Sequence, residues 1–519
     1  MSFSSLQALA TAARSRVAGL ADLLDFWCAA SPSVVAAVEG DRSLTYLELQ
    51  RAVDGCARSF IALGLHKGDR VAMLDQPGID FLVVFLATAR VGGIWVGLNP
   101  RYTDNELECV VSRVKPTFLF VRDRIEDRRY SAWFDRCVGV RVRLGSSSGQ
   151  ESATGVLSID EFLERGWHGA ALPEKASGDD PCLIVFTSGS TGVPKGVVIH
   201  QAALVGTSLI QAEIWKATPL RVLNNLPINH IGCVGDLSCY ALAAGGTIVF
   251  STRFDPRASL ELIERESITV WGQVPAMFQM TLDHPSFESR MIRSLQLIFW
   301  GGATASPELV DRLAALGKPL ATSYGQTETV GSIAFTPHDA TLELLVGTVG
   351  RVVPPYEVRI ARADPSSAEG EIEVRSPFAM VGYWQDDAVE PVASEWRKTG
   401  DIGRLSAAGD ITLLGRVHDI FKSGGYNIYP AEIEAVLQRH PAVRRAAVIG
   451  MSDALFGQVA VAFVEADHSH IEAELQALAD RYLANFKRPK RIVFLEQLPL
   501  LPVGKVDKKT LAATHQHRT

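Results

Sequence analysis

The sequence predicts an α/β protein in which a large N-terminal, multilayer α/β domain precedes a smaller C-terminal α+β domain. Short apolar runs typical of buried strands alternate with helical patterns through most of the chain, and this texture changes near residue 415. The 519 residues, of which 47% are hydrophobic, suffice for a large core divided among several packed units. We therefore expect residues 1–415 to form the first domain and residues 416–519 the second.

The strands expected in the N-terminal domain are short and apolar. The longest apolar stretch, Phe81–Leu98, is interrupted by Arg90 and by Gly92-Gly93. A membrane-spanning helix needs about 20 consecutive apolar residues, so we interpret this stretch as a buried helix followed by a strand. The Ser- and Gly-rich stretch Gly145–Gly155 is typical of a surface loop. The other expected strands are Arg70–Leu74, Thr117–Val121, Cys182–Phe186, Thr247–Phe250 and Leu297–Trp300.

The C-terminal part carries its own pattern of helices and strands, and we expect the boundary before it at Gly415–Asp419. Pro430 suits the first turn of a helix, because the N–H that proline lacks would have no partner there. Val459–Val464 is typical of a strand. The apolar positions of the helix that begins at Pro430 are Ile433, Val436 and Leu437, and those of a second amphipathic helix are Ile471, Leu475, Leu478 and Tyr482.

Charge and cysteine usage exclude several classes of protein. The formal net charge of −7 argues against a nucleic-acid-binding surface. The seven cysteines include no pair separated by two residues, which excludes the common zinc and redox spacings. Their odd number and the lack of a recognisable secretory leader predict reduced thiols in the cytoplasm. Because the first 20 residues lack acidic side chains and contain two arginines, a mitochondrial transit peptide is the alternative.

The strongest local signal is TSGSTGVPKG at residues 187–196, directly after the apolar run CLIVF. A strand that enters a loop of glycines and small hydroxyl residues can direct several backbone N–H groups at phosphate oxygens. A Walker A loop would need Gly at 194 and Ser or Thr at 196, where this chain has Pro194 and Gly196. We therefore predict a phosphate loop of another kind, against the alternative of a flexible turn. Its candidate phosphate-binding residues are Thr187, Ser188, Gly189, Ser190, Thr191, Gly192 and Lys195.

This loop resembles the phosphate-loop signature of the adenylate-forming superfamily, which includes acyl-CoA synthetases, peptide-synthetase adenylation domains and luciferases. Further signatures follow in the order of that family: YGQTE at 324–328, TGDIG at 399–403, GRVHD at 415–419, KSGGYNIYP at 422–430 and PLLPVGKVDKK at 499–509. The resemblance covers nearly the whole chain. It implies a two-step enzyme that converts a carboxylate and ATP into an acyl-adenylate and then transfers the acyl group to a thiol. SGGYNI resembles the branch that uses coenzyme A, so the resemblance implies an ATP-dependent acid–CoA ligase.

The resemblance assigns the nucleotide and its Mg²⁺ to named residues. Glu328 matches the carboxylate that helps to hold the metal, and Thr327 matches a contact to the α-phosphate. Tyr324 matches a flat face for adenine, against the alternative of an ordinary core aromatic residue. Asp401 matches the acceptor of the ribose hydroxyls, and Arg416 a second ribose contact. Backbone at Gly325 and at Gly301-Gly302-Ala303 would lie beside adenine and the acyl carbonyl, although the latter segment could be a plain strand-end turn.

The catalytic and mobile elements implied by the family lie mostly in the C-terminal domain. Lys505 matches the lysine that stabilises the charge developing as a carboxylate attacks the α-phosphorus. The family's small domain rotates between the two steps, and His418 matches the hinge, where relatives usually have Asp or Lys. Ser423, Gly424 and Gly425 match the loop that borders the pantetheine tunnel, where larger side chains would block the thiol. A second departure is Leu500-Leu501, where family members often carry a basic residue and a threonine.

The acyl pocket is expected beside these elements. His230 matches an aromatic or histidine position next to the reacting carbonyl, and as a lone histidine it could instead be structural. Ile231 stands where amino-acid-activating relatives commonly carry an aspartate, and an isoleucine cannot pair with an ammonium group. Val274, Gly302, Val330 and Gly331 would complete a wall suited to a medium-chain, aromatic or alicyclic acid.

Three other functions remain open at this point. The first is an acyl-AMP ligase that loads a carrier protein, and the second is a luciferase-like oxidase. The third, from another class, is a non-catalytic nucleotide- or acyl-binding protein on the same fold. Lys505, Glu328 and Asp401 are all present, which favours an enzyme. We expect ATP, a small-molecule carboxylic acid and CoA as partners, with no nucleic acid and no integral membrane contact. A homodimer is left open.

Overall fold

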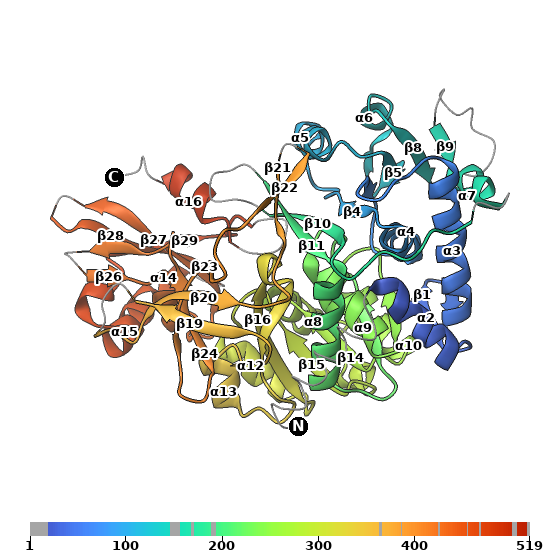
Figure 1. Ribbon diagram of the computed structural model, residues 1–519. Helices are drawn as coiled ribbons and strands as arrows, with labels where there is room; N and C mark the ends of the chain where they lie inside the picture. The colour runs from blue at the N-terminus through green and yellow to red at the C-terminus, as the bar shows by residue number, and fades with distance from the viewer. Residues whose placement is uncertain are drawn as a thin grey trace.

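A computed structural model describes residues 19–145, 156–167, 171–187, 194–362, 366–385, 387–423, 426–453, 455–466, 469–500 and 506–515 (Figure 1). Parallel strands joined by helices build most of the N-terminal part, so the predicted α/β class is confirmed. The strands of the C-terminal part gather with α14 (Pro430–Leu437), α15 (Glu472–Tyr482) and α16 (Lys508–His515) at one end of the molecule (Figure 1). The loop expected at 145–155 and the N-terminal segment lie almost wholly outside the described residues.

Two nine-stranded sheets form the N-terminal part. The first has the order β18 (Arg351–Val352), β17 (Gly331–Phe335), β16 (Leu320–Gln326), β15 (Leu297–Trp300), β14 (Val270–Gln273), β12 (Arg221–Asn224), β13 (Thr247–Phe250), β1 (Val35–Glu39) and β2 (Arg42–Thr45). The second has the order β22 (Ala388–Pro391), β21 (Gly382–Gln385), β11 (Lys195–His200), β10 (Pro181–Thr187), β4 (Ile94–Gly97), β3 (Arg70–Leu74), β5 (Phe118–Arg122), β8 (Val140–Leu144) and β9 (Val156–Ser158). The short pair β6 (Arg124–Ile125) and β7 (Arg128–Arg129) stands apart.

Helices cover these sheets, and one continuous apolar core joins side chains from both of them. The apolar stretch from Phe81 forms α4 (Ile79–Arg90), whose side chains are almost all buried, and then β4, as predicted. Gly92 adopts a positive φ of 77° between them, which a glycine tolerates without strain. The other long helices are α2 (Leu20–Ala30), α3 (Tyr46–Ala62), α5 (Asp104–Val114), α7 (Ile159–Trp167), α8 (Gln201–Ile214), α10 (Pro256–Arg265), α11 (Pro275–Leu282) and α12 (Pro307–Ala314). Shorter ones are α6 (Ser131–Phe134), α9 (Tyr240–Ala243) and α13 (Leu342–Gly347).

Two smaller sheets are built from strands that come after β18 in the chain. A four-stranded sheet has the order β19 (Glu357–Ala361), β20 (Gly370–Arg375), β23 (Arg397–Leu405) and β24 (Ile411–Arg416). A five-stranded sheet contains β26 (Tyr426–Ile428), β25 (Phe421–Ser423), β28 (Gly457–Ala466) and β27 (Val443–Asp453), with β29 (Arg491–Leu495) paired to β28. The expected boundary Gly415–Asp419 covers the end of β24 and the turn that follows it, between the two sheets, and it stays a prediction.

The C-terminal helices agree with the sequence pattern except at one residue. Ile471 and Leu475 are buried as expected beside α15. Tyr482 was predicted on the buried face, but 45% of it is exposed. The guanidinium carbons of Arg439 and Arg481 lie 4.3 and 5.2 Å from its ring centroid. Cation–π contacts can therefore hold an aromatic ring at the surface, where the helical period alone predicts burial.

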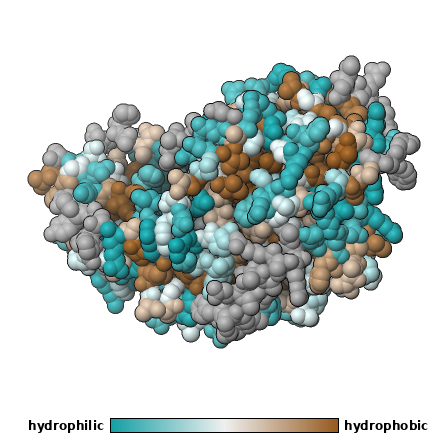
Figure 2. Space-filling view, in the orientation of Figure 1, coloured by the Kyte–Doolittle hydropathy of each residue, from teal (hydrophilic) through white to brown (hydrophobic). Residues whose placement is uncertain are grey.

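The surface is mixed in character. On the face shown in Figure 2, hydrophilic side chains cover much of the described surface and apolar ones gather in patches between them. Across the described ranges, no helix combines the length and the apolar character that a membrane crossing requires.

Candidate active site

Four polar side chains meet where β16, β23 and β24 come together. The Tyr324 hydroxyl donates a hydrogen bond to Asp401 Oδ2 at 2.8 Å, and Gln326 Nε2 donates to the same oxygen at 2.6 Å. Arg416 Nε lies 2.9 Å from Asp401 Oδ1, because β24 pairs with β23 in a register that places Arg416 opposite Asp401. Asp401 is 6% exposed, whereas the Arg416 side chain is 56% exposed. A buried carboxylate is thus held in one orientation, with acceptor capacity left on Oδ1.

Tyr324, Asp401 and Arg416 are predicted from the sequence, whereas Gln326 is not. Its amide also donates to the Thr399 carbonyl at 2.8 Å, so it connects β16 to β23 twice. Tyr324 is 6% exposed and belongs to the main core. Burial, together with the charge of Asp401, raises the pKa of Tyr324, so its hydroxyl stays protonated and donates. The expected stacking of adenine on Tyr324 stays a prediction, while the contact of its hydroxyl with Asp401 is a geometric fact.

Glu328 lies on a short 3₁₀ turn, η3 (Thr327–Thr329), at the end of β16. Burial raises the pKa of its carboxyl group, and a hydrogen bond from Tyr383 opposes that rise. Burial and the charge of Glu328 raise the pKa of Tyr383 to about 12. Lys195 Nζ lies 5.3 Å from the Tyr383 ring centroid, so a cation from the predicted phosphate loop approaches the same place. Tyr383, on β21, is a residue that the sequence analysis missed.

The donor set near Glu328 fits Mg²⁺ of the kind that binds together with a nucleotide. Such an ion usually takes one or two carboxylates and completes its shell with phosphate oxygens and water. Glu328 supplies one partly buried carboxyl group. Within the described ranges, no cluster of three or more His, Cys, Asp or Glu side chains could hold a metal ion by itself.

The predicted phosphate loop connects two antiparallel strands. Thr187 ends β10 and pairs with Lys195, the first residue of β11. The Thr187 hydroxyl lies 3.5 Å from the Lys195 carbonyl oxygen, at the limit of a hydrogen bond. The loop residues Ser188, Gly189, Ser190, Thr191 and Gly192 lie outside the described residues.

The residues predicted to form the acyl wall come from four separate segments. Gly301-Gly302-Ala303 follows β15, and a Cβ added to Gly302 would lie 3.7 Å from Val274 Cγ1. Val330 and Gly331 connect η3 to β17 with positive φ angles of 62° and 95°. His230 and Ile231 stand before η1 (Gly232–Cys239), a π-helix that the sequence pattern did not indicate.

The wall also contains a carboxyl group that the sequence analysis missed. A Cβ added to Gly331 would lie 2.7 Å from Asp236 Oδ1, so Asp236 of η1 reaches the backbone of one of the predicted wall residues. Burial raises the pKa of Asp236 to about 7, and a hydrogen bond from the backbone of Ser332 partly opposes this rise. An aspartate within an otherwise apolar helix next to His230 is the signal that could have identified it.

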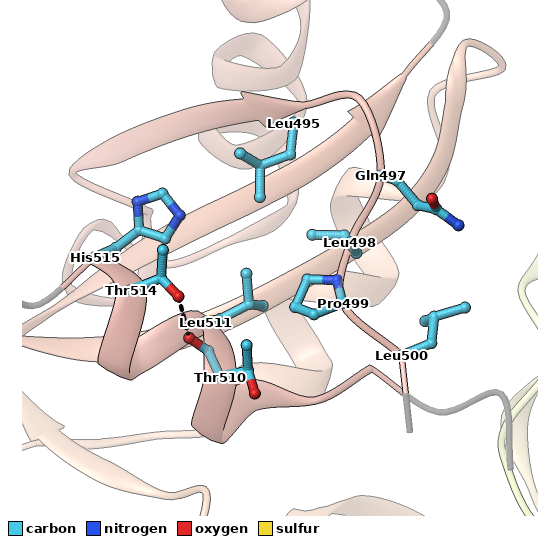
Figure 3. A pocket seen from close by; sticks show the side chains of 9 residues that line it. All are labelled: Leu495, Gln497, Leu498, Pro499, Leu500, Thr510, Leu511, Thr514 and His515. Atoms are coloured by element: carbon cyan, nitrogen blue, oxygen red, sulfur yellow. Dashed lines mark hydrogen bonds between the residues drawn. The ribbon is translucent and has the colours of Figure 1, made fainter. Parts of the chain in front are cut away.

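The C-terminal candidates are placed only in part. His418 is exposed in the turn after β24, and Ser423 is buried at the end of β25. Gly424, Gly425 and Lys505 lie outside the described residues. Leu500 pairs with Val506 across the segment that carries Lys505. A cavity of about 500 Å³ next to Leu500, shown in Figure 3, is lined by Leu498, Leu511 and His515 among others and contains none of the predicted site residues.

Comparison with known proteins places the chain in a family. Residues 24–384 match the AMP-binding enzyme family, and residues 432–505 match the AMP-binding enzyme C-terminal domain. The chain is 33% identical to indoleacetate–CoA ligase of Aromatoleum aromaticum over 94% of this chain and 96% of that protein. It is 34% identical to the 3-[(3aS,4S,7aS)-7a-methyl-1,5-dioxo-octahydro-1H-inden-4-yl]propanoyl:CoA ligase of Mycobacterium tuberculosis, over 92% and 96% of the two chains.

Solved structures agree with these relatives. ATP-bound MatB from Rhodopseudomonas palustris superposes with a TM-score of 0.82 at 27% identity, over 96% of this chain and 99% of that one. o-Succinylbenzoate CoA synthetase from Bacillus subtilis, in complex with its acyl-adenylate intermediate, gives a TM-score of 0.78 at 27% identity, over 94% and 97%. The chain therefore belongs to the AMP-binding enzymes, that is, to the acid–CoA ligase branch of the adenylate-forming superfamily.

Proposed function

We propose that this protein is an ATP-dependent acid–CoA ligase that forms an acyl-AMP intermediate and then an acyl-CoA, releasing pyrophosphate and AMP. The observation that carries the proposal is the proximity of three groups: a buried, hydrogen-bonded Asp401 on β23, Glu328 at the end of β16, and Lys195 at the start of β11, which lies near the Tyr383 ring that contacts Glu328. This arrangement offers an acceptor for ribose, a carboxylate for a metal and a cation for phosphate within one region. Full-length similarity to named CoA ligases supports the same reaction.

In the first half-reaction, the carboxylate of the substrate attacks the α-phosphorus of ATP and pyrophosphate leaves. Asp401 and Arg416 bind the ribose. Adenine is bordered by Tyr324, Gly325 and the backbone of Gly301–Ala303. Thr327 contacts the α-phosphate. The loop from Thr187 to Lys195 binds the outer phosphates through its N–H groups and the lysine charge. Glu328 would hold Mg²⁺, which when bound neutralises part of the phosphate charge.

Lys505 acts in the same step. Carboxylate and phosphate are both anionic, so their approach needs a cation in the transition state. Leu500 and Val506, which flank the segment that carries Lys505, pair with each other, and rotation of the C-terminal domain would bring the lysine to the reacting atoms and withdraw it.

In the second half-reaction, the thiolate of CoA attacks the acyl carbonyl and AMP leaves. We infer that residues 416–519 turn as a unit about His418, which lies exposed between the last strand of one sheet and the first of the next. Ser423, Gly424 and Gly425 then border the pantetheine tunnel. His230 lies beside the reacting carbonyl.

The acyl pocket favours a ring-bearing or medium-chain acid. Ile231, Val274, Gly302, Val330 and Gly331 offer apolar or small surface and no cation for a second carboxylate. Named relatives act on indoleacetate, on a ketone-bearing bicyclic propanoate and, in Amycolatopsis, on ferulate, at 31% identity for the last. We extend to this protein the class that these acids share, which is a carboxylate on an aromatic or alicyclic ring system.

The test is pyrophosphate release measured against aliphatic, aromatic and alicyclic acids, with and without CoA. An acid–CoA ligase releases pyrophosphate with its acid and forms a thioester with free CoA. Adenylate formation without thioester formation would favour the ligase that loads a carrier protein, and ATP binding without turnover would favour a non-catalytic binding protein. We further propose a cytoplasmic location and a homodimer, to be tested by cell fractionation and by light scattering.

A further inference from the structure

Asp236 carries a carboxyl group beside residues that are predicted to form the acyl wall and that are mostly apolar or small. It lies on η1, six positions after His230, in the segment GCVGDLSC. A Cβ added to Gly331 would come within 2.7 Å of Asp236 Oδ1. The carboxyl group therefore lies against the backbone of β17 at the position where the sequence predicts the acyl chain to pass.

Asp236 lies in a largely buried environment. Burial raises its pKa to about 7, and the backbone of Ser332 supplies the hydrogen bond that opposes this rise. Asp236 nevertheless keeps part of its surface accessible. Two titratable neighbours interact with its charge, Tyr356 and Cys239, and burial raises the pKa of both, so both stay neutral at neutral pH.

The backbone around Asp236 is held by buried amide side chains. Gln211 Nε2, on α8, donates to the Asp236 carbonyl oxygen at 2.9 Å. Asn224 Nδ2 donates to the Cys233 carbonyl oxygen at 3.0 Å. π-Helical segments are rare and are frequent at functional sites. These hydrogen bonds hold the backbone of η1 in place at Asp236 and three residues before it.

Resting on the proposed function, we propose that Asp236 is a specificity-determining residue whose carboxyl group accepts a hydrogen bond from an N–H or O–H group on the ring of the acid substrate. A carboxyl group has an oxygen that accepts hydrogen bonds in either protonation state, so Asp236 can accept one from the substrate throughout the neutral pH range. A hydrocarbon ring would displace water from the carboxyl group without offering a hydrogen bond in return, and this lowers the affinity for such an acid. A second carboxylate on the substrate would be repelled.

The test compares acids that differ only in the donor. The matched pairs are para-hydroxyphenylpropanoate with para-methylphenylpropanoate, and indoleacetate with naphthylacetate. The readout is kcat/KM for acid-dependent pyrophosphate release. For at least one pair, the wild type is expected to prefer the donor-bearing acid by about 10–100-fold. Asp236→Leu should abolish or reverse this preference while still using the hydrocarbon acid, and Asp236→Asn, which keeps one acceptor oxygen, should retain part of it.

The exposed Asp339 offers a matched control, because Asp339→Leu makes the same chemical change away from the pocket and should leave the preference unchanged. Equal use of both acids by the wild type overturns the inference, as does an Asp236→Leu enzyme that loses activity equally with both. If Asp236→Leu fails to fold, an unchanged preference in Asp236→Asn decides against the inference. Absence of pyrophosphate release with every acid overturns the proposed function and this inference together, whereas release without donor preference overturns this inference alone.

Discussion

Removing one hydroxyl group separates two roles of Tyr324. Tyr324→Phe keeps the aromatic ring that is predicted to face adenine and deletes the donor that lies 2.8 Å from Asp401 Oδ2. A hydrogen bond to a charged group contributes about 1.5–3 kcal/mol, and Asp401 is buried, so water cannot readily replace it. We therefore expect the free energy of unfolding to fall by about 1.5–3 kcal/mol.

The effect on nucleotide binding should be smaller, because Gln326 and Arg416 still hold the carboxylate at 2.6 and 2.9 Å. We expect ATP affinity to fall by about 1–2 kcal/mol, or about 5–30-fold. The assays are isothermal titration calorimetry with ATP, the KM for ATP in pyrophosphate release, and denaturant unfolding.

Tyr46→Phe is the matched control, because the buried Tyr46 hydroxyl donates to the Gly246 carbonyl at 2.9 Å, outside the site. It should lower stability and leave the KM for ATP unchanged. An unchanged KM in Tyr324→Phe would refute the positioning role of its hydroxyl, and equal rises in both variants would show that the effect is not local. Tyr324→Leu, which deletes ring and hydroxyl, should weaken ATP binding further if the ring does face adenine.

Four further predictions concern the mobile domain, the acyl pocket and pH. Lys505→Ala should slow adenylate formation by about 10²–10³-fold and spare thioester formation from supplied acyl-AMP; equal losses in both half-reactions, measured separately, would contradict the domain rotation. His418→Pro, which restricts φ and removes an N–H donor, should form acyl-AMP at a near-normal rate but transfer it to CoA slowly, while His418→Ala should turn over normally; fast transfer in the proline variant would move the hinge elsewhere. Free amino acids should give no ATP–pyrophosphate exchange, because Ile231 leaves their ammonium group without a partner; robust exchange would overturn that assignment. The pKa of Asp236 is raised from 3.8 to about 7 in the folded state, so the wild type should lose up to about 4 kcal/mol of stability as the pH rises through this range. Asp236→Asn should lack this loss when thermal unfolding is measured between pH 4 and 8. Identical pH profiles of the two proteins would contradict the raised pKa.

Contiguous motifs carried most of what could be predicted of the site. YGQTE and TGDIG are short contiguous motifs, and they occur in the same order as in the family. They therefore indicate the reaction before any contact between them is known. The apolar stretch that forms α4 and β4 could also be predicted, because a segment that is buried on all sides has a continuous hydrophobic sequence. These features are local, and a linear sequence records local chemistry directly.

The partners of those residues were decided by the tertiary structure. Tyr324 and Asp401 are 77 positions apart, and the packing of β16 against β23 brings the hydroxyl group to the carboxylate. Tyr383 reaches Glu328 from β21 of the other large sheet, and Asp236 reaches Gly331 from a π-helix whose eight residues are too few to reveal their period. The amino-acid sequence specifies which chemical groups are present and in which segments they lie. Only the folded chain determined which groups are buried together, and burial is what sets the pKa of Glu328 and Asp236.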